Sequence, residues 1–145
     1  MVKYLSPTST LQLIWTSSLA KKYSRKKRWF IDTGPYPSYL YYAPSEEAWK
    51  SILKKYELPE EPFPTSPGQM TYFSRGYSVG IGIMTINVTK KETEPQVVAM
   101  IAHEAVHYLD YMCERIGEHN PGMEFKAYTV QTIVQGVYTV WKGLK

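Results

Sequence analysis

The sequence predicts an α+β fold, because segments with helical spacing alternate with short runs that have the composition of β-strands. The order that we expect is helix, strands, helix, strands and then two helices. Its 145 residues can bury one core without disulfides or a structural metal. We therefore expect a single domain, with a helical and aromatic N-terminal portion at residues 1–56 and the candidate functional residues at 70–145.

The first predicted helix covers residues 8–26, where the apolar residues with helical spacing are Leu11, Ile14, Trp15 and Leu19. At its end the run KKYSRKKR, from Lys21 to Arg28, carries six of the chain's 17 Lys and Arg residues. These cations can contact nucleic-acid phosphates, or they can form a solvated helix end that complements the helix dipole. The sequence leaves both interpretations open.

Two aromatic-rich runs, at 28–32 and 39–42, flank Thr-Gly-Pro-Tyr-Pro and predict a hairpin of two strands. Ser45 is followed by two glutamates, which is typical of an N-cap and an acidic first turn, so we expect a helix over 45–56. Prolines recur through residues 57–68. This stretch is therefore expected to be a surface connection.

Residues 70–74 and 77–88 predict two further strands around Arg75-Gly76. In the second strand, one face is expected to carry Val79, Ile81, Ile83, Thr85 and Asn87. Gly80 and Gly82 interrupt the other face. They indicate either a sheet edge where an extended peptide can pair, or a bulge or tight packing point.

A capping box at Thr93 and Gln96 predicts the start of a helix that contains the sequence HEAVH. Its two histidines, His103 and His107, lie one turn apart on the same helix face, where both imidazoles can reach one zinc ion. Glu104 lies beside them and can orient and deprotonate a metal-bound water. The alternative is that the histidines only pack or form hydrogen bonds between helices.

A catalytic zinc ion needs a third protein ligand and an open position for water. Glu114 is in phase with His107, but it lies about 10 Å further along the helix, which is too far unless the helix breaks first. Glu124 is better placed, because residues 117–122 can reverse the chain and residues 120–121 can begin a second, antiparallel helix. The other candidate ligands are Cys113 and His119.

The HEAVH sequence followed by a glutamate on the next helix resembles the gluzincin pattern of zinc metallopeptidases. The string EFKAYTVQ, which begins at Glu124, also resembles the ExxAYxxQ continuation of short HExxH proteins of phages and bacteria. The resemblance covers residues 72–131. It implies a zincin-like fold, in which a small antiparallel or mixed sheet packs against the HExxH helix and a following C-terminal helix. It implies His103, His107 and Glu124 as zinc ligands and Glu104 as the general base.

The chain departs from the better-known branches of these enzymes. No NExxSD string surrounds Glu124, so the supporting acid of the thermolysin branch does not carry over, and Asp110 is at best a replacement. Asp110 and Cys113 also stand where metzincins have glycine and histidine. Peptide deformylases take a cysteine ligand upstream of the helix, whereas Cys113 lies downstream. A single cysteine cannot build the zinc ribbon of SprT-like proteases.

The predicted activity is hydrolysis of amide bonds in a protein or peptide substrate, with Zn²⁺ as cofactor. Peptidases of this kind also need a donor that stabilises the oxyanion. Tyr128 lies one turn beyond Glu124 on the same face and is the first candidate, although it can equally pack between the two helices.

The alternative function is a nucleic-acid-binding or regulatory module, which uses the basic segment 21–28 and keeps only a structural or vestigial zinc site. The single cysteine and the lack of a long apolar run favour a cytoplasmic protein that makes no membrane contact. The resemblance implies a phage-encoded enzyme that acts on a host or viral protein.

Overall fold

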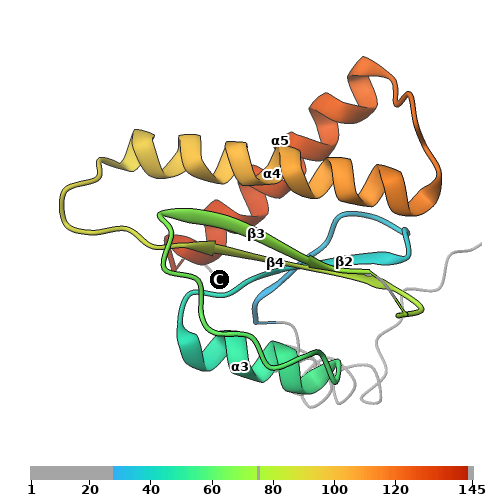
Figure 1. Cartoon of the computed structure of the whole chain (residues 1–145). Coiled ribbons are helices and arrows are strands. Elements are labelled where there is room, and N and C mark those ends of the chain that lie inside the picture. The colour runs from blue at the N-terminus through green and yellow to red at the C-terminus, as the bar shows by residue number, and fades with distance from the viewer. Residues whose placement is uncertain (1–27, 75, 144–145) are drawn as a thin grey trace, which may run out of the picture.

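The computed structural model describes residues 28–74 and 76–143, and this part of the chain has an α+β fold (Figure 1). It contains one mixed sheet with the strand order β1-β2-β4-β3. The strands are β1 Phe30–Ile31, β2 Ser38–Tyr42, β3 Gly68–Phe73 and β4 Gly80–Ile86. β1 pairs with β2 and β3 pairs with β4 in antiparallel orientation, whereas β2 and β4 are parallel. The predicted helix over 8–26, and the basic run except Arg28, lie outside the described residues.

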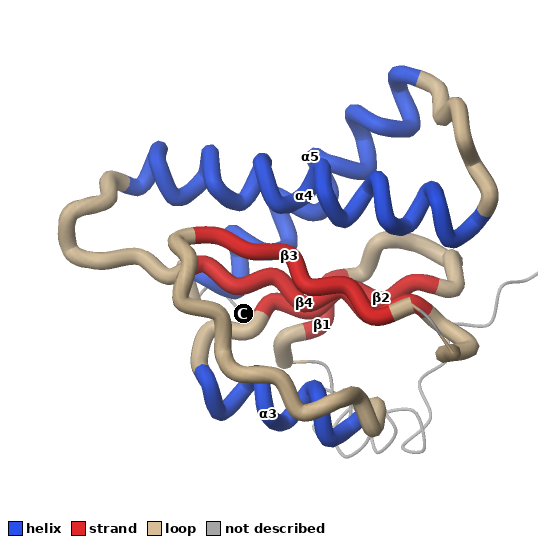
Figure 2. Tube along the Cα trace, in the orientation of Figure 1, coloured by secondary structure: helices blue, strands red, loops and turns tan. Residues whose placement is uncertain are grey.

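Helix α3, Glu46–Lys55, covers one face of the sheet (Figures 1 and 2). The Ser45 side chain accepts a hydrogen bond from the Ala48 backbone N–H, as the predicted N-cap requires. The helix buries Trp49 and Ile52 against Ile81 and Ile83 of β4. The strand face expected from the alternation at residues 79–87 is therefore confirmed, and it is the face that α3 covers.

Helix α4, Glu94–Ile116, lies on the opposite face of the sheet (Figure 1). It begins at the predicted capping box, where the Thr93 N–H donates to Gln96 Oε1. It ends at Gly117, whose left-handed backbone has φ 73°. Within the described residues, no helix is long and apolar enough to cross a bilayer.

Helix α5, Met123–Trp141, follows a short loop and crosses α4 (Figure 1). The predicted start at residues 120–121 is wrong. The Asn120 N–H instead bonds Glu118 Oε1, and the helix is capped by Gly122, which has an extended backbone and whose carbonyl accepts a hydrogen bond from the Lys126 N–H. At the other end of α5, the Lys142 ammonium lies 2.7 Å from Glu94 and fixes these turns to the start of α4.

The strand that carries Gly80 and Gly82 lies inside the sheet, between β2 and β3, so the expectation of a peptide-binding edge there is wrong. The glycines are instead a tight packing point. A methyl group at Gly82 would lie 2.7 Å from the Tyr108 ring of α4, and one at Gly80 would collide with the Tyr72 hydroxyl. Among the described residues, β3 is the edge strand on this side.

A hydrogen-bonded group of hydroxyls joins β2, β3 and α4 at this packing point. Ser38 Oγ lies 2.8 Å from the Tyr72 hydroxyl and 2.9 Å from the Tyr108 hydroxyl. Thr33 Oγ1 lies 3.2 Å from the same Tyr108 hydroxyl. Because Tyr108 is fully buried, these partners offset the cost of removing its hydroxyl from water.

Gly82→Ala is expected to lower the free energy of unfolding by about 1–3 kcal/mol, because the added methyl group overpacks the contact with Tyr108. Urea unfolding measures the loss. In a Tyr108→Ala background the same change should cost much less, since the clashing ring is gone. If Gly82→Ala lowered the free energy of unfolding equally in both backgrounds, the contact with Tyr108 would not be the cause of the loss.

Alkaline pH should destabilise the fold, because burial raises the pKa values of Tyr42 and Tyr108 from 10.0 to about 12. Between pH 10 and 12 the unfolded chain loses these phenolic protons while the folded chain keeps them, so the free energy of unfolding falls as the pH rises. The loss is about 2–3 kcal/mol for each tyrosine. Urea unfolding at several pH values across this window measures the effect. The free energy of unfolding should fall less steeply with pH for Tyr108→Phe than for the wild type.

Candidate metal and catalytic site

The two histidines of HEAVH lie one turn apart on the exposed face of α4. Their Nε2 atoms are 3.2 Å apart, and their ring centroids are separated by 4.9 Å. Two nitrogens that each lie about 2.0–2.1 Å from a tetrahedral zinc ion are themselves about 3.3 Å apart. His103 and His107 therefore have the spacing of a chelating pair, although the same spacing also allows one ring to donate a hydrogen bond to the other.

Glu104 follows His103, but its side chain turns toward the sheet and is 7% exposed. A methyl group at Gly68 would lie 3.2 Å from Glu104 Oε1, so the carboxylate rests against the first residue of β3. Among the described residues it has no hydrogen-bond partner. The carboxylate is thus held beside the histidine pair with its acceptor oxygens available.

The edge of β3 with which no other described strand pairs runs past this carboxylate. Asn87 N–H donates to Pro67 C=O at 2.8 Å, and hydrogen-bonded pairs alternate along the antiparallel β3–β4 ladder. The N–H and C=O groups of alternate residues therefore point away from β4. These residues are Gly68, Met70 and Tyr72. They can accept an extended peptide as a further strand.

The structure does not bring Glu124 together with the two histidines. Among residues 28–74 and 76–143, no group of three or more His, Cys, Asp or Glu side chains is placed to hold a metal ion. The first turn of α5 stands away from α4, with Met123 83% exposed beside Glu124 (Figure 1). Glu124 as the third ligand stays a prediction.

Tyr128, on the next turn of α5, is 64% exposed. The alternative in which Tyr128 packs between the two helices is therefore wrong. Its role as an oxyanion donor is untested by this geometry and stays a prediction.

The other candidate ligands lie apart from the pair. Cys113 is buried, and burial raises the pKa of its thiol, as do Asp110 and Glu118, which disfavours a thiolate ligand. His119 is exposed in the loop before α5. Glu114 is exposed two turns after His107, on a helix that does not break before it.

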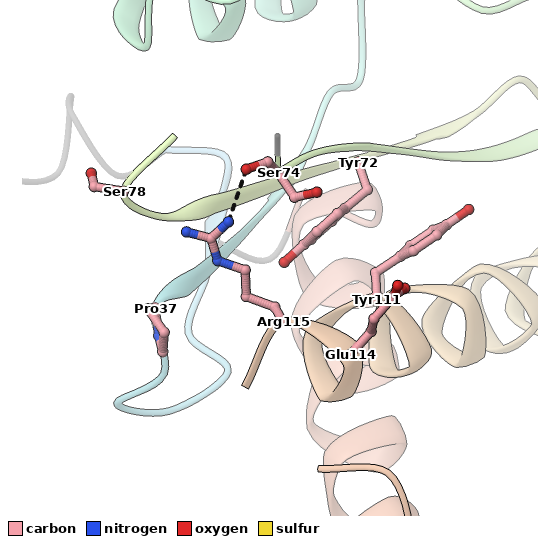
Figure 3. Close-up of a pocket in the computed structure, with 7 residues that line it drawn as sticks. All are labelled: Pro37, Tyr72, Ser74, Ser78, Tyr111, Glu114 and Arg115. Carbon is pink, nitrogen blue, oxygen red and sulfur yellow. Dashed lines mark hydrogen bonds between the residues drawn. The ribbon is translucent and has the colours of Figure 1, made fainter. Parts of the chain in front are cut away.

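A pocket of about 520 Å³ lies further along α4, next to the end of β3 (Figure 3). Its lining residues are Pro37, Tyr72, Ser74, Ser78, Tyr111, Glu114 and Arg115. Sequence reasoning missed the two tyrosines. The four-residue spacing from His107 to Tyr111 places Tyr111 on the histidine face, but nothing in the sequence aligns Tyr72 with that helix.

Comparisons of this chain with protein-family models, with curated proteins and with solved structures found no match. The class of the protein therefore has to be argued from the site itself. In the part of the chain that it describes, the structure defines an α+β protein in which a histidine pair neighbours a carboxylate that has no hydrogen-bond partner, and this carboxylate lies against the edge strand β3. Figure 1 shows that α4, the helix that contains His103, Glu104 and His107, runs along the sheet.

The purified protein is expected to bind about one zinc ion per chain, and His103→Ala and His107→Ala should each abolish binding because they leave half of the chelating pair. Elemental analysis after dialysis measures the bound metal. His119→Ala is the matched control and should retain zinc. Loss of zinc from Glu124→Ala would identify the third ligand. If the wild type binds no added zinc, the remaining interpretation is that one histidine ring donates a hydrogen bond to the other.

Proposed function

We propose that this chain is a zinc-dependent metallopeptidase that hydrolyses amide bonds in an extended protein or peptide segment. The observation that carries the proposal is the 3.2 Å separation of the two Nε2 atoms, beside a carboxylate that has no hydrogen-bond partner among the described residues. A histidine pair that only stabilised the fold would be expected in the core, yet both rings are exposed. The proposed ligands are His103, His107 and Glu124.

When bound, zinc would polarise the scissile carbonyl and lower the pKa of a coordinated water. Glu104 would take the proton from that water and pass it to the leaving amine. Its position between the helix and the strand edge suits this role, because the carboxylate is shielded from bulk solvent and still has both oxygens available.

The substrate is proposed to lie along the free edge of β3. Backbone hydrogen bonds to Gly68, Met70 and Tyr72 would hold it extended and would place one amide bond beside Glu104. Tyr128 is proposed to donate a hydrogen bond to the oxyanion, which requires the start of α5 to approach the histidines. A cytoplasmic location is proposed from the single cysteine.

Glu104→Gln is expected to lower the hydrolysis rate about 10²–10⁴-fold while zinc stays bound, because an amide cannot accept the proton of the water. The measurement uses an unfolded protein substrate and detects new termini by mass spectrometry, together with zinc content. Glu118→Gln is the matched control, since it makes the same chemical change in the exposed loop after α4.

Two results would contradict the proposal. One is undiminished hydrolysis by zinc-loaded Glu104→Gln. The other is hydrolysis by the wild type that survives removal of zinc with a chelator.

A further inference from the structure

The pocket next to the end of β3 is separate from the histidine pair but shares its two supporting elements. Neither the histidines nor Glu104 line it. Tyr72 reaches it from the strand edge, and Tyr111 and Glu114 reach it from the exposed face of α4. Figure 3 shows the two rings side by side, with the Glu114 carboxylate beside Tyr111. A peptide on the β3 edge would therefore pass this pocket.

The aromatic part of the pocket is fixed before any ligand arrives. The Tyr72 and Tyr111 rings are stacked, with centroids 5.1 Å apart and an interplanar angle of 12°. Ser38 holds the Tyr72 hydroxyl at 2.8 Å, so this ring cannot turn away without losing a hydrogen bond. A ligand that binds here meets a formed aromatic surface.

The charges in the pocket are not equivalent. Arg115 donates from one terminal nitrogen to Ser74 O at 2.8 Å and from the other to Tyr77 O at 2.7 Å, so its guanidinium is used to hold the loop after β3. The Glu114 carboxylate is exposed and has no hydrogen bond or ion pair with another described residue. It is the charge that a ligand can pair with.

These features favour a cation over an anion. The faces of tyrosine rings attract ammonium and guanidinium groups, and Glu114 adds an opposite charge beside them. An anionic side chain would meet both the carboxylate and the negative ring faces. Arg115 also lines the pocket, but each of its two terminal nitrogens already donates to a backbone carbonyl, of Ser74 or of Tyr77.

The distance from the histidines gives the position of the bound side chain. Glu114 follows His107 by two helical turns, which is about 10 Å along α4. An extended peptide advances about 3.3–3.4 Å per residue, so this distance corresponds to about three residues. We propose that the pocket binds a lysine or arginine side chain about three residues from the bond that is cut, so that the substrates are basic peptide segments. This assignment of substrate class rests on the proposed peptidase function.

A binding experiment tests the pocket without any need for catalysis. Wild-type protein with labelled tyrosines is titrated with N-acetyl-lysine methylamide and with the leucine and glutamate analogues, and tyrosine ring resonances are followed by NMR. The lysine compound should shift Tyr72 and Tyr111 and bind at least about fivefold more tightly than the leucine compound. Glu114→Gln should remove this preference, whereas Asp110→Asn, one turn earlier and outside the pocket, should keep it. The proposal would be overturned if the leucine analogue bound as tightly as the lysine compound, or if the glutamate analogue bound more tightly than it.

A cleavage experiment then tests the substrate class. Wild type and Glu114→Lys are incubated with a complex peptide mixture, and the cleaved positions are mapped by mass spectrometry. The wild type should show Lys and Arg enriched at one fixed position about three residues from the cut, and the variant should shift this enrichment toward Asp and Glu. Cleavage with no such enrichment would overturn the pocket assignment and leave the peptidase standing. Lysine-selective binding with no cleavage would overturn the peptidase and the substrate class, and would leave a cation-binding pocket.

Discussion

The close contact between Tyr108 of α4 and Gly82 of β4 sets the geometry on which the candidate site depends. The ring occupies the space that a side chain at position 82 would fill, and its hydroxyl is held by Ser38. With Tyr108 pointing into the sheet, the 100° turn per helical residue directs His107 outward and leaves Glu104 at the boundary with β3. A helix turned by one residue in one direction would bury His107, and one turned in the other direction would expose the Glu104 carboxylate.

The local elements of the fold could be predicted because each has a cause within a few residues. Ser45 caps α3, the capping box at Thr93 starts α4, and alternation along β4 identifies the face that packs on α3. The parallel pairing of β2 with β4 could not be predicted, since it joins segments about forty residues apart and leaves no local pattern. For this reason the sequence could not show that Gly80 and Gly82 lie inside the sheet and that β3 is the edge.

The candidate site also has a part that could be predicted from local sequence and a part that could not. The spacing of His103 and His107 follows from helical periodicity alone, so the pair could be predicted from the sequence and lies at chelating distance. The position of Glu124 depends on the angle at which α5 leaves the loop. Among the described residues, the charged contacts between α5 and the start of α4 are at the far end of α5, where Lys142 and the Tyr138 hydroxyl meet the Glu94 carboxylate. A local pattern at 120–124 contains no information about that angle.

The burial of Glu104 is the strongest argument that the site is chemical rather than structural. Placing a carboxylate side chain at 7% exposure removes much of its hydration, and proteins normally offset this cost with hydrogen bonds or a paired cation. Among the described residues Glu104 has neither, whereas the buried hydroxyl of Tyr108 has two partners. The fold thus satisfies the buried tyrosine hydroxyl and leaves the carboxylate without a partner among the described residues. Such a cost is expected where the group must accept a proton from a substrate or a water.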